Sequence, residues 1–323
     1  MCTAVSYKTN AHYFGRSLDL WYSYNESVAV TPRRYLFGFR HMPHLASHYA
    51  MIGMATVVDG YPLYYEATNE AGLSMAGLNF PGNAVYFPYT EGKDNVASFE
   101  FIPWILGQCG SVREARELLA RINLTDDNFS AVMPYSPLHW MISDKNSSIV
   151  VESVADGLRV YDNPVLVLTN SPPFDYHMLN LQNYMNVTAA APANRFSESL
   201  ELKPFSLGMG SIGLPGDMSS PSRFVRAAFV RHNSVSDGNE DDSVAQFFHI
   251  LGSVAQPRGC TGVDGKFEYT LYSSCCNTDT GVYYYTTYEN SGITAVSMKK
   301  CDPFGDKVIS YPLETKPNIL WQN

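Results

Sequence analysis

The sequence lacks the long apolar runs and leader segments that mark membrane and exported proteins. No stretch approaches the roughly 20 consecutive apolar residues that a membrane span needs. The N-terminal region contains no basic segment followed by an apolar run. We therefore expect a cytoplasmic protein. In that location its Asn-x-Ser/Thr triplets have no role in glycosylation, because such acceptors matter only in secreted chains.

Basic residues and regularly spaced cysteines are also scarce. The 22 Lys and Arg against 31 Asp and Glu give a net charge of −9, which argues against a nucleic-acid partner. The 6 cysteines have no regular spacing, and the adjacent Cys275 and Cys276 are not a C-x-x-C zinc motif. Although His41, His44 and His48 lie close together, their spacing is not H-E-x-x-H, so we expect no metal site.

No Pro/Gly/Ser-rich linker and no internal repeat divides the chain, so we expect one domain over residues 1–323. Strand-like segments dominate both ends, and helical spacing occurs between them. This order predicts an α+β fold in which two sheets pack together with helices outside. Strands are predicted within 2–9, 13–20, 27–35, 49–80, 138–154, 158–170, 266–274, 281–290 and 293–300, and helices at 97–108, 111–122, 174–185, 220–233 and 243–254.

The second residue is the first candidate for chemistry. If Met1 is removed, Cys2 carries a thiol and a free α-amine, which is a nucleophile joined to its own candidate base. The reference pKa values of these groups, about 8.5 and about 7.7 to 8, allow both to change protonation near neutral pH. The alternative is an incidental second residue or a small core hydrophobe. Because the N-terminus is predicted to be a strand in a hairpin, we expect Cys2 to be held in place.

Polar residues at strand ends are further candidates, each with a plain structural alternative. Arg16 and Asp19 lie three apart on one predicted strand, and side chains at that spacing face opposite ways. A bulge or a strand end is needed for both to reach Cys2; otherwise they are an ordinary surface pair. Asn79 and Asn170 each end an apolar run before a turn, where asparagine is commonly a turn former.

Six sequence blocks, taken in order, resemble the choloylglycine hydrolase family, which contains bile salt hydrolases and penicillin V acylases. They are MCTAV, YFGRSLDL, NEAGLSMAGLNFPG, SPLHWMISDKNSSIVVE, LTNSPPFDYHMLNLQNY and LPGDMSSPSRFVRAAF. The resemblance runs from the first residue to about residue 290. It implies a four-layer αββα sandwich of two antiparallel sheets, the fold of the N-terminal nucleophile hydrolases. The family's functional positions map onto Cys2, Arg16, Asp19, Asn79, Asn170 and Arg223, with Arg226 of the same helical stretch as the alternative to Arg223.

The resemblance implies a mechanism for the cleavage of an amide bond. After loss of Met1, the Cys2 sulfur attacks the carbonyl and its own α-amine carries the proton. Asp19 orients that amine, and Arg16 stabilises negative charge on the sulfur. The oxyanion is held by Asn170 and by Asn79. Neither a metal nor an organic cofactor is implied.

Within the family, Asn79 in AGLNFPGNA resembles the bile salt hydrolases, whereas some penicillin V acylases have tyrosine there. The expected substrates are therefore bile salts conjugated to glycine or taurine, with penicillin V as the alternative. Leu18 and Leu20 are expected to line the apolar part of the pocket. A catalytically silent sandwich that binds bile acids is the alternative of another class. The resemblance also implies a homotetramer.

Overall fold

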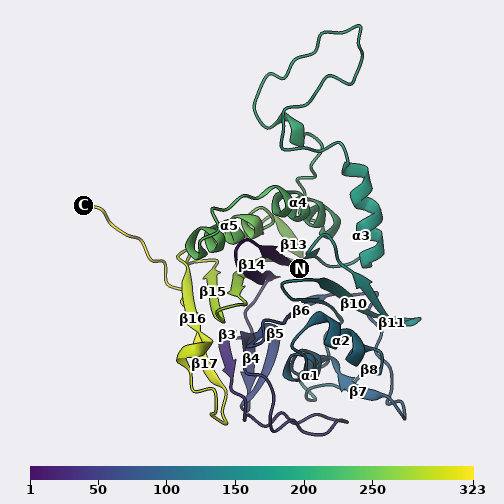
Figure 1. Cartoon of the computed structure of the whole chain (residues 1–323), viewed down its shortest axis with the longest axis vertical. Helices are drawn as coiled ribbons and strands as arrows, with labels where there is room; N and C mark the ends of the chain where they lie inside the picture. The colour runs from purple at the N-terminus through teal and green to yellow at the C-terminus, as the bar shows by residue number, and fades with distance from the viewer.

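The N-terminal segment forms the predicted hairpin, which lies inside a large sheet of the computed structural model (Figure 1). The structure describes all 323 residues. Strands β1 (Cys2–Lys8) and β2 (His12–Leu20) pair in the register Cys2↔Leu18 to Lys8↔His12. We call their sheet of 7 strands sheet I. Its path is β12 (Val167–Leu168), β1, β2, β14 (Lys266–Asn277), β15 (Val282–Thr287) and β16 (Thr294–Ser297), with β13 (Thr261–Val263) paired to β14.

The second sheet, sheet II, has 8 strands, and both sheets are antiparallel throughout. Its order is β11 (Gly157–Asp162), β10 (Ser148–Val154), β9 (Leu138–Ser143), β6 (Ser74–Asn79), β5 (Tyr61–Asn69), β4 (Met51–Val58), β3 (Ser27–Thr31) and β17 (Ile309–Pro312). A small parallel pair, β7 (Asp94–Ala97) and β8 (Ile122–Thr125), was not predicted. Strands of four residues leave too short a pattern for recognition from sequence.

The central strands of sheet II are buried on both faces, because each face packs against a separate core. In β9, Met141 belongs to a core of 35 buried residues, while its neighbours Trp140 and Ile142 belong to a second core of 25. Helices α4 (Ser220–Asn233) and α5 (Glu240–Gly252) cover sheet I, and α1 (Phe101–Gln108) and α2 (Val112–Leu119) cover sheet II (Figure 1). The predicted αββα order is therefore confirmed.

Side-chain caps set where two of these helices begin. Ser111 accepts a hydrogen bond from the Glu114 N–H at 3.3 Å, so α2 begins directly after it, at the start of the predicted helix 111–122. The Glu114 carboxylate reaches past Ser111 to the Gly110 N–H at 2.7 Å. Helix α5 begins three residues earlier than predicted, because Asn239 caps it and acidic residues fill its first turn.

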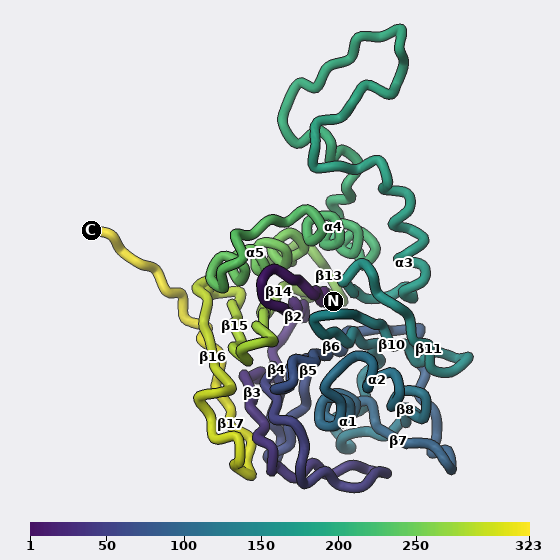
Figure 2. The backbone as a smooth tube through the Cα atoms, viewed as in Figure 1, coloured from purple at the N-terminus to yellow at the C-terminus, as the bar shows by residue number.

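A long excursion leaves the body of the protein between α3 (Phe174–Leu181) and α4 (Figure 2). Within residues 185–219 the only helical element is the short 3-10 turn Met209–Ser211.

No helix anywhere in the chain combines the length and the apolar character needed to cross a bilayer.

Candidate active site

Cys2 is the first residue of β1, and its side chain is only 3% exposed. Its N–H donates to the Asn170 side-chain oxygen at 2.8 Å. Met1 continues the hairpin by one residue, since it exchanges main-chain hydrogen bonds with Asp19. The Met1 amine also pairs with the Glu268 carboxylate at 2.9 Å. The chain end is therefore fixed in the sheet, as the sequence predicts, and is not frayed.

Asn170 connects Cys2 to two other predicted residues. Its side-chain oxygen accepts from the Cys2 N–H and from Arg223 Nη2 at 2.7 Å. Its Nδ2 donates to the main-chain oxygen of Asn79 at 2.7 Å. A carboxamide nitrogen carries two N–H donors, so one donor of Asn170 remains for a further acceptor. Asn79 thus joins this cluster through its main chain.

Arg223 lies on α4 and is fully buried. Its Nη1 donates to the Cys2 main-chain oxygen at 2.6 Å and to the Thr3 hydroxyl at 2.7 Å. Its Nε donates to the Met218 main-chain oxygen at 3.0 Å. Arg226 makes none of these contacts and donates to three other main-chain oxygens. The structure therefore places Arg223, and not Arg226, at Cys2.

Arg16 approaches Cys2 from β2. Because side chains alternate along a strand, Arg16 shares the face of Leu18, which is paired with Cys2. Its Nη1 donates to the Gly77 main-chain oxygen at 2.5 Å, and its nearest carboxylate is that of Glu66, at 3.9 Å from Nε. Burial by itself would lower the pKa of Arg16, but neighbouring groups, first among them Cys2, raise it above its ordinary value.

Glu66 is a buried acidic residue that sequence reasoning missed. Its carboxylate accepts hydrogen bonds from three hydroxyls, those of Tyr272 at 2.8 Å, Ser274 at 2.9 Å and Tyr283 at 2.5 Å. Burial raises its pKa, although Arg16 and these hydroxyls act in the opposite direction. The available signal was one acidic residue within the otherwise uncharged strand YPLYYEATN.

Asp19 belongs, by register, to the face of β2 opposite to that of Arg16, as the spacing predicts. A β-bulge lies beside it, between Thr270 and Tyr272 of β14, and bulges change strand twist and redirect side chains. One Asp19 carboxylate oxygen accepts from the Thr270 hydroxyl at 2.7 Å, and the other is buried without a partner. Burial lowers the pKa of Arg223, and the negative charge of Asp19 opposes that shift.

The two predicted pocket leucines differ in exposure. Leu18 is 4% exposed and packs in the larger core, whereas Leu20 is partly buried at the end of β2. Leu20 is followed by aromatic rings in contact, with Trp21 and Tyr22 centroids 5.4 Å apart and Tyr22 and Tyr24 centroids 4.6 Å apart. The apolar surface near the N-terminal hairpin is therefore made by Leu20 and these rings more than by Leu18.

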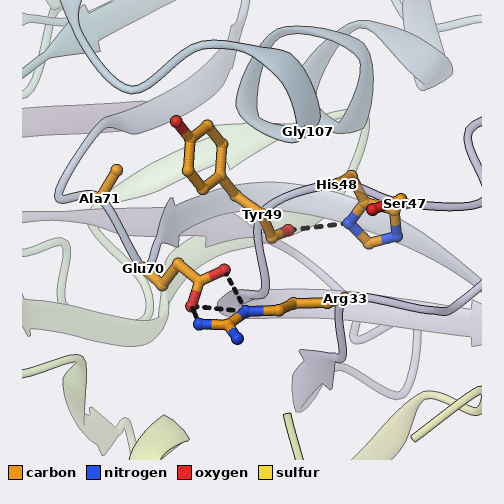
Figure 3. A pocket seen from close by; sticks show the side chains of 7 residues that line it. All are labelled: Arg33, Ser47, His48, Tyr49, Glu70, Ala71 and Gly107. Carbon is orange, nitrogen blue, oxygen red and sulfur yellow. Dashed lines mark hydrogen bonds and ion pairs between the residues drawn. The ribbon is translucent and has the colours of Figure 1, made fainter. Parts of the chain in front are cut away.

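A separate cavity of about 500 Å³ surrounds the ion pair between Arg33 and Glu70 (Figure 3). Arg33 Nε lies 2.8 Å and Nη2 lies 2.5 Å from the nearest Glu70 oxygens. Burial raises the pKa of Glu70, but the hydrogen bonds from Arg33 and the Ala50 N–H outweigh it and lower the pKa. The lining contains none of the predicted catalytic residues; it consists of Arg33, Ser47, His48, Tyr49, Glu70, Ala71 and Gly107.

The clustered histidines are engaged separately. His41 pairs with Asp127 at 2.7 Å, whereas both ring nitrogens of His48 face main-chain oxygens. No three side chains of the types that ligate metals converge in the structure. The histidine cluster is thus part of the local loop structure.

Comparison with known proteins gives consistent matches over the whole chain. The chain is 54% identical over 317 residues to a bile salt hydrolase/transferase of Lactiplantibacillus plantarum, covering 98% of each. It is 40% identical to the bile salt hydrolase/transferase of Clostridium perfringens, covering 96% of each. A solved variant of the conjugated bile acid hydrolase from C. perfringens has a TM-score of 0.92 with complete coverage of both chains and 38% identity.

More distant structures share the fold alone. A penicillin V acylase from Agrobacterium tumefaciens has a TM-score of 0.76 and 20% identity, covering 96% of this chain and 90% of the acylase. The family of linear amide C–N hydrolases called the choloylglycine hydrolase family matches residues 2–306. The predicted resemblance is therefore confirmed, and the chain belongs to the choloylglycine hydrolase family of linear amide C–N hydrolases.

Proposed function

We propose that this protein hydrolyses the amide bond of bile salts conjugated to glycine or taurine, with Cys2 as the nucleophile. The observation that carries the proposal is the arrangement around Cys2. Its nitrogen lies 2.8 Å from the Asn170 side-chain oxygen, and the same carboxamide is held by Arg223 and by the Asn79 main chain. The relatives named above as bile salt hydrolases supply the substrate class.

The reaction begins with removal of Met1, because an amide nitrogen at Cys2 cannot act as a base. The Cys2 sulfur then attacks the substrate carbonyl carbon, and the freed α-amine takes the thiol proton. When the C–N bond breaks, this proton passes to the leaving nitrogen of glycine or taurine. Water then attacks the thioester carbon, its proton passes through the α-amine to the Cys2 sulfur, and the free bile acid leaves.

The oxyanion of each tetrahedral intermediate needs fixed donors. The unused N–H of Asn170 is one, and Asn79 is assigned as the second. Arg223 holds the Asn170 oxygen, which keeps the Nδ2 end turned toward the reacting carbonyl. Arg16 supplies positive charge beside the sulfur, and the unpartnered Asp19 oxygen is assigned to the new α-amine.

Apolar surface beside the N-terminal hairpin suits a steroid. A steroid buries more apolar area than the phenoxymethyl group of penicillin V. At roughly 25 cal/mol per Å², an extra 100 Å² or so is worth about 2.5 kcal/mol, and ordering costs reduce this. Leu20 and the Trp21 and Tyr22 rings are the residues placed to provide this surface.

The test is amine release by Met1-free protein from glycocholate, taurocholate and penicillin V. We expect kcat/KM for a conjugated cholate to exceed that for penicillin V by at least about tenfold, from the area difference above. A higher value for penicillin V would overturn the substrate class and leave the Cys2 chemistry standing. Tight bile-salt binding without amine release would instead support a binding protein.

We also propose a cytoplasmic homotetramer. All 6 cysteines are free thiols, which suits a reducing compartment. The excursion at 185–219 carries side chains that are more than 80% exposed although apolar, and such surface favours burial against another copy. These are Met185, Phe196, Phe205 and Leu207. Light scattering should give four times the mass of one chain, and a monomeric mass for the intact protein would contradict this assembly.

A further inference from the structure

Two buried histidines that take no part in the proposed chemistry contact the main-chain carbonyls of Thr169 and Asn170. We call these two residues the oxyanion segment, because Asn170 carries the proposed oxyanion donor. His139 Nε2 lies 2.9 Å from the Thr169 oxygen, and His177 Nε2 lies 2.8 Å from the Asn170 oxygen. The two rings come from different elements, β9 and α3, and both are fully buried. Asn170 is therefore held by its main chain as well as by its side chain.

Each ring also stacks on the residue that follows another site residue. His139 lies on Phe80 with centroids 4.2 Å apart and planes 6° apart, and Phe80 follows Asn79. His177 lies on Phe224 with centroids 4.7 Å apart and planes 19° apart, and Phe224 follows Arg223. Through their ring nitrogens the two histidines contact the segment that carries Asn170. Through their ring faces they pack against the segments that carry Asn79 and Arg223.

The donor on His177 can be assigned from its surroundings. Burial lowers its pKa to about 4, so the ring is neutral near pH 7. The Asn170 main-chain oxygen can only accept a hydrogen bond, so the single proton of the neutral ring lies on Nε2, which donates it to that oxygen.

The rest of the network fixes the same segment. The Asn170 N–H donates to the Ser220 hydroxyl at 2.9 Å, and that hydroxyl donates to the Thr169 hydroxyl at 2.9 Å. Glu152 accepts from the first N–H of α3, at Phe174, and lies 3.0 Å from His139 Nδ1. Both peptide groups flanking the Asn170 Cα thus have fixed hydrogen bonds.

We propose that His177, supported by His139, is a positioning residue for the oxyanion donor. It touches neither substrate nor sulfur. The Asn170 carboxamide must present its oxygen to the Cys2 nitrogen and Arg223 while keeping one N–H free for the oxyanion. A tilt of the Asn170 peptide plane would move all of these groups together, and oxyanion donors act only when fixed in place. This inference rests on the proposed function of Asn170.

The experiment compares His177→Gln with His177→Met, two side chains of similar size of which only glutamine has an N–H donor. We expect the methionine variant to lose about 10-fold or more in kcat, with KM nearly unchanged. This is less than the roughly 100- to 1,000-fold loss that follows removal of an oxyanion donor itself. Glutamine should restore most of that loss. His177→Phe keeps a flat ring on Phe224 without the donor, so it should be more stable than glutamine and yet slower.

His12 provides a matched control, since it is buried and hydrogen-bonded by both ring nitrogens, to Ser6 at 2.8 Å and Thr278 at 2.9 Å. It makes no contact with Asn170. His12→Met should lower the melting temperature and leave kcat within about twofold, because its contacts lie outside the oxyanion segment.

Two results would overturn the inference: equal kcat in the glutamine and methionine variants of His177, or a kcat that follows melting temperature across all four variants. Failure of the proposed function gives a different result. Wild-type protein that releases no amine from glycocholate, taurocholate or penicillin V contradicts the proposed function and the positioning role together. Normal wild-type turnover with equal variants contradicts the positioning role alone.

Discussion

Arg223 at Cys2 and Arg33 at the outer cavity are the same residue type in opposite electrostatic situations. Arg223 is fully buried, and it donates hydrogen bonds to main-chain oxygens, a hydroxyl and a carboxamide, all of them neutral. Arg33 has a side chain 41% exposed, and its hydrogen bonds go to the Glu70 carboxylate. The first arginine is neutralised by nothing in direct contact, and the second is neutralised by its partner.

The positive charge of Arg223 therefore remains available in the site although the side chain is buried. A charge removed from water must be compensated, and a carboxylate partner would do this while cancelling its field. Carbonyl dipoles compensate Arg223 and leave its net charge in the site. Arg16 is intermediate between the two: its hydrogen bonds go to main-chain oxygens, but the buried Glu66 carboxylate forms an ion pair with its Nε at 3.9 Å.

The largest effect should come from Cys2, the proposed nucleophile, which this buried cluster surrounds. Cys2→Ser is nearly isosteric, so the fold should persist. Hydrolysis of conjugated cholate should fall by several orders of magnitude, because a hydroxyl is a far poorer nucleophile near neutral pH. Amine release within tenfold of the parent would remove Cys2 from the mechanism.

Arg223→Met tests the buried half of the comparison directly. It leaves the Cys2 oxygen and the Asn170 carboxamide without their donor, and we expect kcat to fall by about 100-fold or more, consistent with a buried charged hydrogen bond worth about 2–5 kcal/mol. Arg226→Met, one turn along the same helix, is the control and should retain most activity. Equal losses in the two variants would mean that α4 is simply destabilised.

Buried histidines should make the stability of the fold depend on pH. Burial lowers the pKa of His12 and of His177 to about 4, whereas the unfolded value is about 6.5. Between these values the unfolded chain binds a proton that the folded chain does not, so stability present above pH 6.5 is lost as pH falls toward 4. Across this pH range each histidine accounts for a loss of up to about 3 kcal/mol in the free energy of unfolding.

Melting temperatures from pH 7 to pH 4 measure this loss. His12→Gln and His177→Gln should each flatten the fall, because glutamine does not titrate. Variants with the same slope as the parent would show that carboxyl groups alone control the acid response.

The smallest effect is expected at the exposed pair. Arg33→Met should lower the free energy of unfolding only slightly, since a partly exposed ion pair is screened by water. Its kcat should be unchanged within about twofold, because the cavity holds none of the proposed catalytic groups. Measured unfolding free energies and kinetics of this variant check both halves. If kcat of Arg33→Met fell as far as kcat of Arg223→Met, the cavity around Arg33 would be part of the active site.

The sequence could predict the parts of the fold that depend on local patterns. Alternation predicted the hairpin that holds Cys2, and helical spacing predicted the start of α2 to within one residue. The sequence could require a bulge or a strand end between Arg16 and Asp19, but β2 keeps a regular register with β1 there. The bulge lies instead on β14, opposite Asp19, and it could not be predicted because it depends on pairing between strands about 250 residues apart in the chain. Glu66 and His177 were missed for the same reason.

The predicted site residues drew on two kinds of information. Cys2 could be argued from its own chemistry, since a thiol and an α-amine on one residue suffice for a nucleophile and a base. Asn79 and Asn170 read equally well as turn formers, and only resemblance to a family singled them out. Their proximity depends on sheets I and II meeting at Cys2, a tertiary contact that no local pattern encodes.

A comparison of protein with and without Met1 tests whether Cys2 acts with a free α-amine. Intact mass should separate the two forms, and each is then assayed for amine release from glycocholate. We expect turnover only in the form that begins at Cys2, since Met1 occupies that amine and is held by Asp19 and Glu268. Equal kcat in a form shown to retain Met1 would contradict the account.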